Sequence, residues 1–229
     1  MKGKFVGMNL KSKYLIIILA VIIIKINFSI NVKAEEYSRF NNISIEDGLS
    51  QATVETMMQD SKGYIWLGTN DGLDRYNGYT FKKYSYEKGQ ENSLVNSYIL
   101  DIKEDSEGNI WVATAAGISK IYNDGEKVQN YTSDSESGNL SNDNTTTMLI
   151  SNSNKIYVGT AEGINLYDKK TDKFNLIYPE LKEEYVNSLA EDKYGNIWAG
   201  TENGLYKINV VTNAIERFES TDDVNTISE

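Results

Sequence analysis

DSKGYIWLGTNDGLDRYNG, residues Asp60 to Gly78, decides the fold because the chain repeats it. Near copies start at Asp105 (DSEGNIWVATAAGISKIYNDG) and at Asp192 (DKYGNIWAGTENGLYKIN), and a weaker copy, SNSNKIYVGTAEGINLYD, starts at Ser151. Aligning the copies superimposes four aromatic residues that are separated by 45, 46 and 41 residues: Trp66, Trp111, Tyr157 and Trp198. Self-similarity with a period of this length indicates a repeat architecture.

Each copy begins with an alternating segment and a tight turn. Alternation of apolar and polar residues, as in residues 53–60, 98–105 and 186–192, predicts a strand with one buried face. In the turn D-S-K-G and its equivalents, the Asp side chain opens the turn and a Gly with positive φ closes it. In the weaker copy, Ser151 to Asn154 contain neither Asp nor Gly. Asn also adopts the left-handed conformation, so we expect the turn there too.

The rest of each copy has the pattern of three further strands. The I-W-L-G-T segment is nearly continuous in apolar residues, which predicts a strand buried on both faces. A tight hairpin loop follows, and in each copy it ends in a glycine where a Cβ would be costly: Gly72, Gly117, Gly163 and Gly204. After a third strand, each copy ends in an outer, more polar strand, at residues 80–86, 127–133, 174–178 and 215–220. No window shows the period of an amphipathic helix.

Four short antiparallel strands in each repeat make one blade of a β-propeller. We therefore predict an all-β fold for residues 40–229, with about four consecutive four-stranded blades of a larger, incomplete propeller. The blades would span roughly residues 48–94, 95–140, 141–181 and 182–223, and a fifth would start at 224–229, where VNTISE resembles the VNSLAE at Val186. The segment FNNISI, from Phe40 to Ile45, would be the outer strand donated to close the ring.

The N-terminus has the pattern of a secretory signal peptide over residues 1–34. Four lysines precede the apolar run Tyr14–Ile24, and the segment ends in small residues at Val32 and Ala34. The alternative is an N-terminal membrane anchor, but eleven apolar residues are short of the roughly 20 that a spanning helix needs. Removing the six lysines of this segment from 23 basic residues leaves 17 against 33 acidic ones, a net charge of about −16. That charge disfavours nucleic acid as a partner and fits an exported domain.

The composition excludes several kinds of chemistry. The chain has no His and no Cys, which rules out a Ser-His-Asp triad, a His- or Cys-ligated metal and a phospho-accepting histidine in this chain. No acidic cluster has the spacing of a calcium loop. We therefore predict no catalytic residue, no metal site and no cofactor, and the pattern leaves the binding residues unidentified.

A secreted glycosidase is the enzyme alternative, because propellers host sialidases and the turn motif is faintly similar to their Asp-box. The spacing differs, since Gly follows Asp by three residues here and by two there. A sialidase also needs three arginines around the substrate carboxylate, and this chain has only Arg39, Arg75 and Arg217 in total. Abundant acids do not single out a catalytic pair. The aromatic of each second strand is better explained as a wedge between blades than as a ligand-stacking group.

The repeat Asp-x-x-Gly-x-Ile-Trp-x-Gly-Thr-x-x-Gly-Leu resembles that of the two-component regulator propeller family, and the resemblance covers Phe40 to Glu229. The leader FNNISIEDGLSQATV, Phe40 to Val54, resembles the opening of the sensor regions built from this repeat. The resemblance implies an extracytoplasmic input domain that senses a small molecule or carbohydrate, usually within a homodimer. It also implies a downstream membrane helix and output module, usually a histidine kinase, sometimes a diguanylate cyclase or a DNA-binding unit.

In this interpretation the ligand would meet loops on one face of the propeller, because binding residues concentrate on loops held by a rigid scaffold. Two longer loops, Glu87–Ser93 and Ser133–Asn144, would join the hairpin loops there. The hairpin-loop residues are Asn70, Asp71, Ala115, Ala116, Ala161, Glu162, Glu202 and Asn203. The alternative function is a secreted propeller that acts as a protein- or carbohydrate-binding platform.

Overall fold

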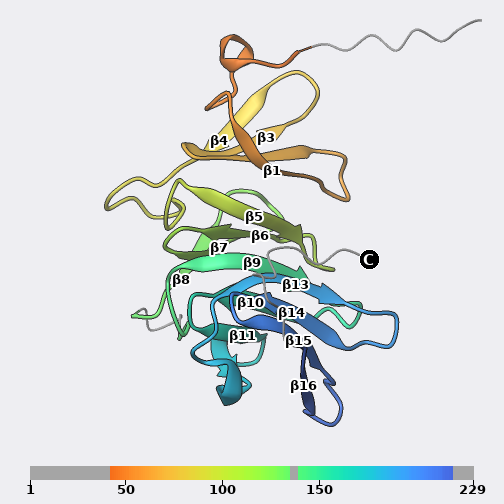
Figure 1. Cartoon of the computed structure of the whole chain (residues 1–229). Helices are drawn as coiled ribbons and strands as arrows, with labels where there is room; N and C mark the ends of the chain where they lie inside the picture. The colour runs from red at the N-terminus through yellow and green to blue at the C-terminus, as the bar shows by residue number, and fades with distance from the viewer. Residues whose placement is uncertain (1–41, 135–138, 219–229) are drawn as a thin grey trace, which may run out of the picture. The chain divides into compact units, whose positions relative to one another are not determined.

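The structure, a computed structural model, describes residues 42–134 and 139–218. The predicted signal peptide at 1–34 and the predicted start of a fifth blade at 224–229 lie outside the described residues. Within them the chain forms four antiparallel sheets of four strands each, in the orders β1-β2-β3-β4, β5-β6-β7-β8, β9-β10-β11-β12 and β13-β14-β15-β16. The all-β prediction and the propeller blades are thereby confirmed (Figure 1).

The strands are short and regularly spaced along the chain. The first two sheets contain β1 (Val54–Gln59), β2 (Ile65–Thr69), β3 (Gly72–Tyr76), β4 (Phe81–Tyr84), β5 (Ile99–Glu104), β6 (Ile110–Thr114), β7 (Gly117–Ile121) and β8 (Val128–Tyr131). The other two contain β9 (Thr145–Ile150), β10 (Ile156–Thr160), β11 (Gly163–Asp168), β12 (Lys173–Ile177), β13 (Val186–Glu191), β14 (Ile197–Thr201), β15 (Gly204–Ile208) and β16 (Ile215–Phe218). Two 3-10 turns, η1 (Ile45–Asp47) and η2 (Pro179–Leu181), precede the first and fourth sheets.

The donated strand predicted at Phe40–Ile45 is not a strand in its described part. Ile45 begins η1, and Ser44 caps this turn by accepting a hydrogen bond from the amide of Glu46. The Asp47 carboxylate accepts in return from the amide and hydroxyl of Ser44, at 2.8 and 2.9 Å. This reciprocal capping satisfies the local backbone better than an isolated extended segment would.

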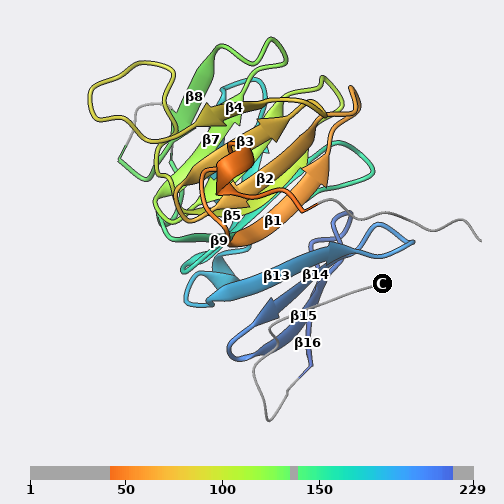
Figure 2. The same cartoon turned by 90° about the horizontal axis from the view of Figure 1, so that it is seen from above.

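Consecutive sheets pack face to face through their first strands. β1 lies beside β5, β5 beside β9, and β9 beside β13, as Figures 1 and 2 show. The hydrophobic core is correspondingly divided into three clusters, one between each pair of neighbouring sheets. Every residue of β6 and β10 is buried, as the continuous apolar pattern predicts, whereas β2 and β14 include half-buried residues because their sheets have one described neighbour each.

In the first three sheets the repeated aromatic residue of the second strand is a wedge between blades, as predicted. Trp66 packs with Ile102 and Val112 of the second sheet, and Trp111 packs with Ile156, Val158 and Phe174 of the third. Tyr157 packs in the same way with residues of the fourth sheet. Both indoles are almost completely buried, so each contributes about 3 kcal/mol of hydrophobic stabilisation to the contact between sheets.

Candidate functional site

The hairpin loops between the second and third strands are rigid. The hydroxyl of Thr69 donates to the carbonyl of Gly72 at 2.8 Å and accepts from the amide of Asp71 at 3.1 Å. Thr114, Thr160 and Thr201 do the same in the other three sheets, and all four threonines are fully buried. The two residues between each Thr and Gly are thus displayed on a fixed scaffold, as a binding surface requires.

The structure brings most of the predicted loop residues against the segment that leads into the same sheet. The amide of Asn70 donates to Gln51 at 3.1 Å, and the carboxylate of Glu162 accepts from Asn142 at 3.1 Å. The side chain of Asn203 donates to Glu184 at 3.2 Å. Backbone hydrogen bonds to the lead-in segments place three more residues there: Ala115, Ala161 and Glu202. Asp71 and Ala116 bond through their amides to the threonine of their own loop.

The two longer predicted loops differ in position. From the loop Ser133–Asn144, Ser141 contacts Thr160 through their hydroxyls at 2.9 Å, so its described part lies beside the hairpin loop of the third sheet. The loop Glu87–Ser93 instead runs along the outer strand β8. Its Asn92 accepts a hydrogen bond from the amide of Val128, at the end of β8 away from the hairpin loops. The expectation that this loop joins the others is therefore wrong.

A second repeated element, which the sequence interpretation missed, anchors these lead-in segments. Each segment carries a buried leucine, and the four are separated by 45, 46 and 41 residues, the same separations as the aromatic wedges: Leu49, Leu94, Leu140 and Leu181. A search for any apolar residue at the repeat spacing would have found them. Their burial fixes each lead-in segment on its sheet.

A polar residue in the middle of each third strand holds the same segment. Buried Asp74 accepts from the amide and hydroxyl of Ser50 at 2.7 and 2.8 Å, and Asn165 accepts from the amide of Ser141 at 2.9 Å. In the fourth sheet the Tyr206 hydroxyl donates to Glu184 at 2.8 Å. Burial and this hydrogen bond raise the pKa of Tyr206 to about 12. These contacts are structural and pre-organise the loop surface.

The turn aspartates do more than open hairpins. The carboxylate of Asp60 accepts hydrogen bonds from the backbone amides of Lys62 and Tyr64. It also accepts a hydrogen bond of 2.8 Å from the indole nitrogen of Trp66. Asp105 and Asp192 bind Trp111 and Trp198 in the same way, at 2.8 and 3.1 Å. Hydrogen bonds from Asn196, Trp198 and two backbone amides hold the pKa of Asp192 well below its usual range.

Each tryptophan belongs to a cluster of four residues, which we name the wedge cluster: the turn Asp, the Trp, a cation on the third strand and an aromatic on the fourth. The cation lies over the indole at 5.0–5.7 Å, and the ring centroids are 5.5–5.7 Å apart. The members are Asp60, Trp66, Arg75 and Tyr84 in the first sheet, Asp105, Trp111, Lys120 and Tyr131 in the second, and Asp192, Trp198, Lys207 and Phe218 in the fourth.

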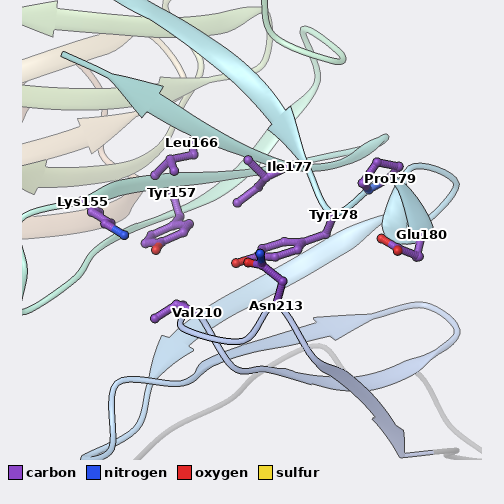
Figure 3. Close-up of a pocket in the computed structure, with 9 residues that line it drawn as sticks. All are labelled: Lys155, Tyr157, Leu166, Ile177, Tyr178, Pro179, Glu180, Val210 and Asn213. Atoms are coloured by element: carbon purple, nitrogen blue, oxygen red, sulfur yellow. The ribbon is translucent and has the colours of Figure 1, made fainter. Parts of the chain in front are cut away.

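The third sheet replaces all four members of the wedge cluster. Strand register places Ser151, Tyr157, Leu166 and Ile177 at the corresponding positions. The turn still forms, because Asn154 adopts a left-handed φ of 57°, as the sequence predicts. A pocket of about 380 Å³ opens beside these residues, and Tyr157, Leu166 and Ile177 line it (Figure 3).

The described residues contain neither a cluster of metal ligands nor a helix that could span a membrane. In residues 42–134 and 139–218, the acidic side chains form no group of three or more that could hold a metal ion. In the same part of the chain, no helix has the length and apolar character needed to cross a membrane.

Comparisons with known proteins agree with the repeat pattern. Residues 48–71, 93–116 and 180–203 match the family model described as "Two component regulator propeller". Over 57 residues the chain is 42% identical to Histidine kinase P4 of Formosa agariphila, an alignment that covers 24% of this chain and 4% of that protein. The chain thus spans only a small part of this curated relative.

Solved structures share the fold. The extracellular domain of a hybrid two component system from B. thetaiotaomicron superposes with a TM-score of 0.59 and 21% identity, over 78% of this chain and 32% of that one. A virginiamycin B lyase from Staphylococcus aureus gives a TM-score of 0.58 with 15% identity, over 78% of this chain and 59% of the lyase. At these identities the likeness concerns the fold alone. The three matched segments show that the chain carries repeats of the two component regulator propeller family, and the solved structures show the fold.

Proposed function

We propose that the chain is the extracytoplasmic, non-catalytic input region of a two-component signalling protein and that it senses a small ligand there. The observation that carries the proposal is the match of three of its four blades to the two component regulator propeller repeat. The similarity to a histidine kinase over 57 residues supports it. The N-terminal segment, with the pattern of a signal peptide, supports export.

The physical basis of the proposed function is a rigid scaffold with displayed loops. Fully buried threonines fix the hairpin loops, and buried leucines fix the lead-in segments beside them. Each sheet packs on the next through one of the three hydrophobic clusters, so a ligand that prefers one packing of the sheets would shift the population of that packing. A membrane-linked output module would respond to that shift, and we expect the input region to act within a homodimer.

The experiment tests export and membrane attachment in the native host. Spheroplasts, in which the periplasmic side of the inner membrane is accessible, are treated with a protease and then fractionated, and an antibody raised against residues 43–218 follows the protein. The proposal predicts an antigen that sediments with membranes and is degraded from outside. An antigen that is protected in spheroplasts contradicts export. An antigen that is released into the medium contradicts the signalling role and favours the binding-platform alternative.

A further inference from the structure

The pocket beside the third sheet has the size and lining of a ligand site. Its volume of about 380 Å³ falls in the lower part of the range for small-molecule pockets. Figure 3 shows it between the strands of the third sheet and the turn that follows β15. Leu166, Ile177 and Val210 supply apolar surface. The rings of Tyr157 and Tyr178 project into the space between the third and fourth sheets. A flat apolar molecule fits such walls.

The pocket exists because the third sheet departs from the repeat. In the second sheet Lys120 lies over the indole of Trp111, and Tyr131 packs against it. The third sheet has Leu166 and Ile177 at the positions of Lys120 and Tyr131, and the smaller Tyr157 in place of the indole. In the first, second and fourth sheets the cation and the aromatic ring of the wedge cluster occupy this position, whereas in the third sheet the smaller side chains leave it open. The difference is one of side-chain volume and not of backbone, since the strand pairing is the same.

The pocket also contains two hydroxyl groups that have no hydrogen-bond partner among the described residues. Neither the Tyr157 nor the Tyr178 hydroxyl makes a hydrogen bond within residues 42–134 and 139–218. Burial raises the pKa of both, that of Tyr157 to about 12, with further contributions there from Tyr178 and Glu191. Both are therefore neutral phenols at neutral pH, and each offers one donor and one acceptor.

Tyr178 is held in an unusual backbone conformation that presents its ring to the pocket. Its φ is 55°, a left-handed value that is uncommon for a large residue and costs about 1 kcal/mol or more. It precedes Pro179, which lines the same pocket and begins η2. Strain of this kind is concentrated at ligand sites, where the surrounding structure maintains it.

The two charged groups of the pocket lie at its opposite ends. Figure 3 shows Lys155 at one end and Glu180 at the other, with the two tyrosines between them. An anionic group of a ligand is therefore stabilised at the Lys155 end, where an ammonium donates charge-assisted hydrogen bonds. A hydrogen-bond donor of the ligand is stabilised at the Glu180 end.

We propose that this pocket binds a small planar aromatic carboxylate, with its ring between Tyr157 and Tyr178 and its carboxylate at Lys155. The proposal deepens the proposed function, because it names a ligand class and a site for the input region. It is tested on the purified chain without any output module. If the purified chain does not bind the probe, the proposal about the pocket fails and the results on export and membrane attachment still stand. If the protein is not exported, the proposed function fails and the binding result still stands.

The test uses 4-hydroxybenzoate as the probe and calorimetry, with saturation-transfer NMR, as the readout. We expect saturable binding below about 10 mM, the range open to a ligand of this size. Lys155→Gln should raise the Kd at least fivefold, about the loss of one charge-assisted hydrogen bond. Lys170→Gln, at an exposed lysine in the turn after β11, is the matched control and should leave the Kd unchanged. The neutral analogue 4-hydroxybenzyl alcohol should bind about as weakly as the acid binds to Lys155→Gln.

A filling variant tests the origin of the pocket. Tyr157→Trp with Leu166→Lys restores two of the four wedge-cluster side chains of the second sheet, the indole and the cation over it, and should abolish binding while the circular dichroism spectrum is kept. Tyr178→Phe removes only a hydroxyl, and it should weaken binding even if the filling variant does not fold. The proposal is overturned if 4-hydroxybenzoate shows no saturable binding. It is equally overturned if the chain binds the probe and the Lys155 and Tyr178 variants bind it unchanged.

Discussion

The indole nitrogen of Trp111 donates a hydrogen bond of 2.8 Å to the carboxylate of Asp105, and both residues are buried. This bond joins the turn between β5 and β6 to the wedge that packs against the third sheet. The same pair occurs in the first and fourth sheets. One side chain thus organises both the local hairpin and the contact between blades.

Asp105→Ala should destabilise the protein by about 3 kcal/mol, because it leaves several donors unsatisfied in a buried place. The carboxylate accepts hydrogen bonds from Glu107, from the amide and side chain of Asn109, and from Trp111. Urea unfolding followed by tryptophan fluorescence measures the change.

Asp124→Ala is the matched control for that prediction. Asp124 also accepts two backbone hydrogen bonds in a turn, but it is exposed and binds no indole. Its replacement should cost less than about 1 kcal/mol. Equal losses for the two variants would show that the bond to the wedge contributes nothing beyond turn formation.

Gly117→Ala should be far more destabilising than Gly78→Ala. Both glycines have a positive φ, of 120° and 94°, so both variants incur backbone strain of about 1 kcal/mol. A Cβ at Gly117 would lie 2.5 Å from the carbonyl oxygen of Tyr131, whereas a Cβ at Gly78 meets nothing within 4 Å. We therefore expect about 2 kcal/mol or more of additional loss at Gly117. Thermal unfolding of the two variants side by side tests this, and equal melting temperatures would refute the steric explanation.

The repeat made the fold predictable from the sequence, and particular residues show why. The period placed the turns and the strands, and Asn154 confirms that Asn substitutes for Gly in the turn of the third sheet. The wedge role of Trp66 and Trp111 followed from size and apolar context. The hydrogen bond between the Trp111 indole and Asp105 was not predicted. The sequence pattern explained the aspartate by the turn and the tryptophan by the contact between blades, so it gave no reason to expect that the two side chains meet.

The pocket could not be predicted from the sequence, for a different reason. Leu166 and Ile177 are ordinary strand residues when read alone, and only the strand register shows that they stand where other sheets carry a cation and an aromatic ring. The loop Glu87–Ser93 was placed wrongly because nothing in its polar sequence predicts that Asn92 bonds to the outer strand β8. The 3-10 turn at Ile45 likewise depends on a cap formed by Ser44 and Asp47.

Leu94→Ala should destabilise the protein by about 3 kcal/mol, since it removes a large side chain that is 1% exposed and leaves a cavity. Met57, which is 71% exposed on β1, provides the control, and Met57→Ala should cost less than about 0.5 kcal/mol. Chemical denaturation curves give both values. A loss at Leu94 as small as that at Met57 would mean that the lead-in segment is not anchored by this leucine.

Stability should fall as the pH rises from about 10 to about 12. A raised pKa means that the folded protein holds the phenol proton more tightly than the unfolded chain, in which tyrosine titrates near 10. The stabilisation is complete below that value and is lost as the pH approaches the folded pKa of about 12 for Tyr157 and Tyr206. Each group contributes a slope of up to about 1.4 kcal/mol per pH unit.

Tyr157→Phe separates this effect from general alkaline denaturation. The variant should match the parent at pH 8, because the hydroxyl has no protein partner within the described residues, and it should be more stable than the parent at pH 11. Tyr79→Phe, at a residue that is 90% exposed, should change neither value. Identical alkaline slopes for the parent and Tyr157→Phe would contradict the assignment.

The most direct test of the central claim is to identify the native polypeptide that carries these blades. An antibody against residues 43–218 is used to isolate the protein from its host, and the intact mass and tryptic peptides are measured. The account predicts a polypeptide larger than the 25.8 kDa of this chain, with peptides from a membrane segment and a signalling output module. A polypeptide of 25.8 kDa or less with no such peptides would contradict the input-region function and leave a secreted binding module in its place.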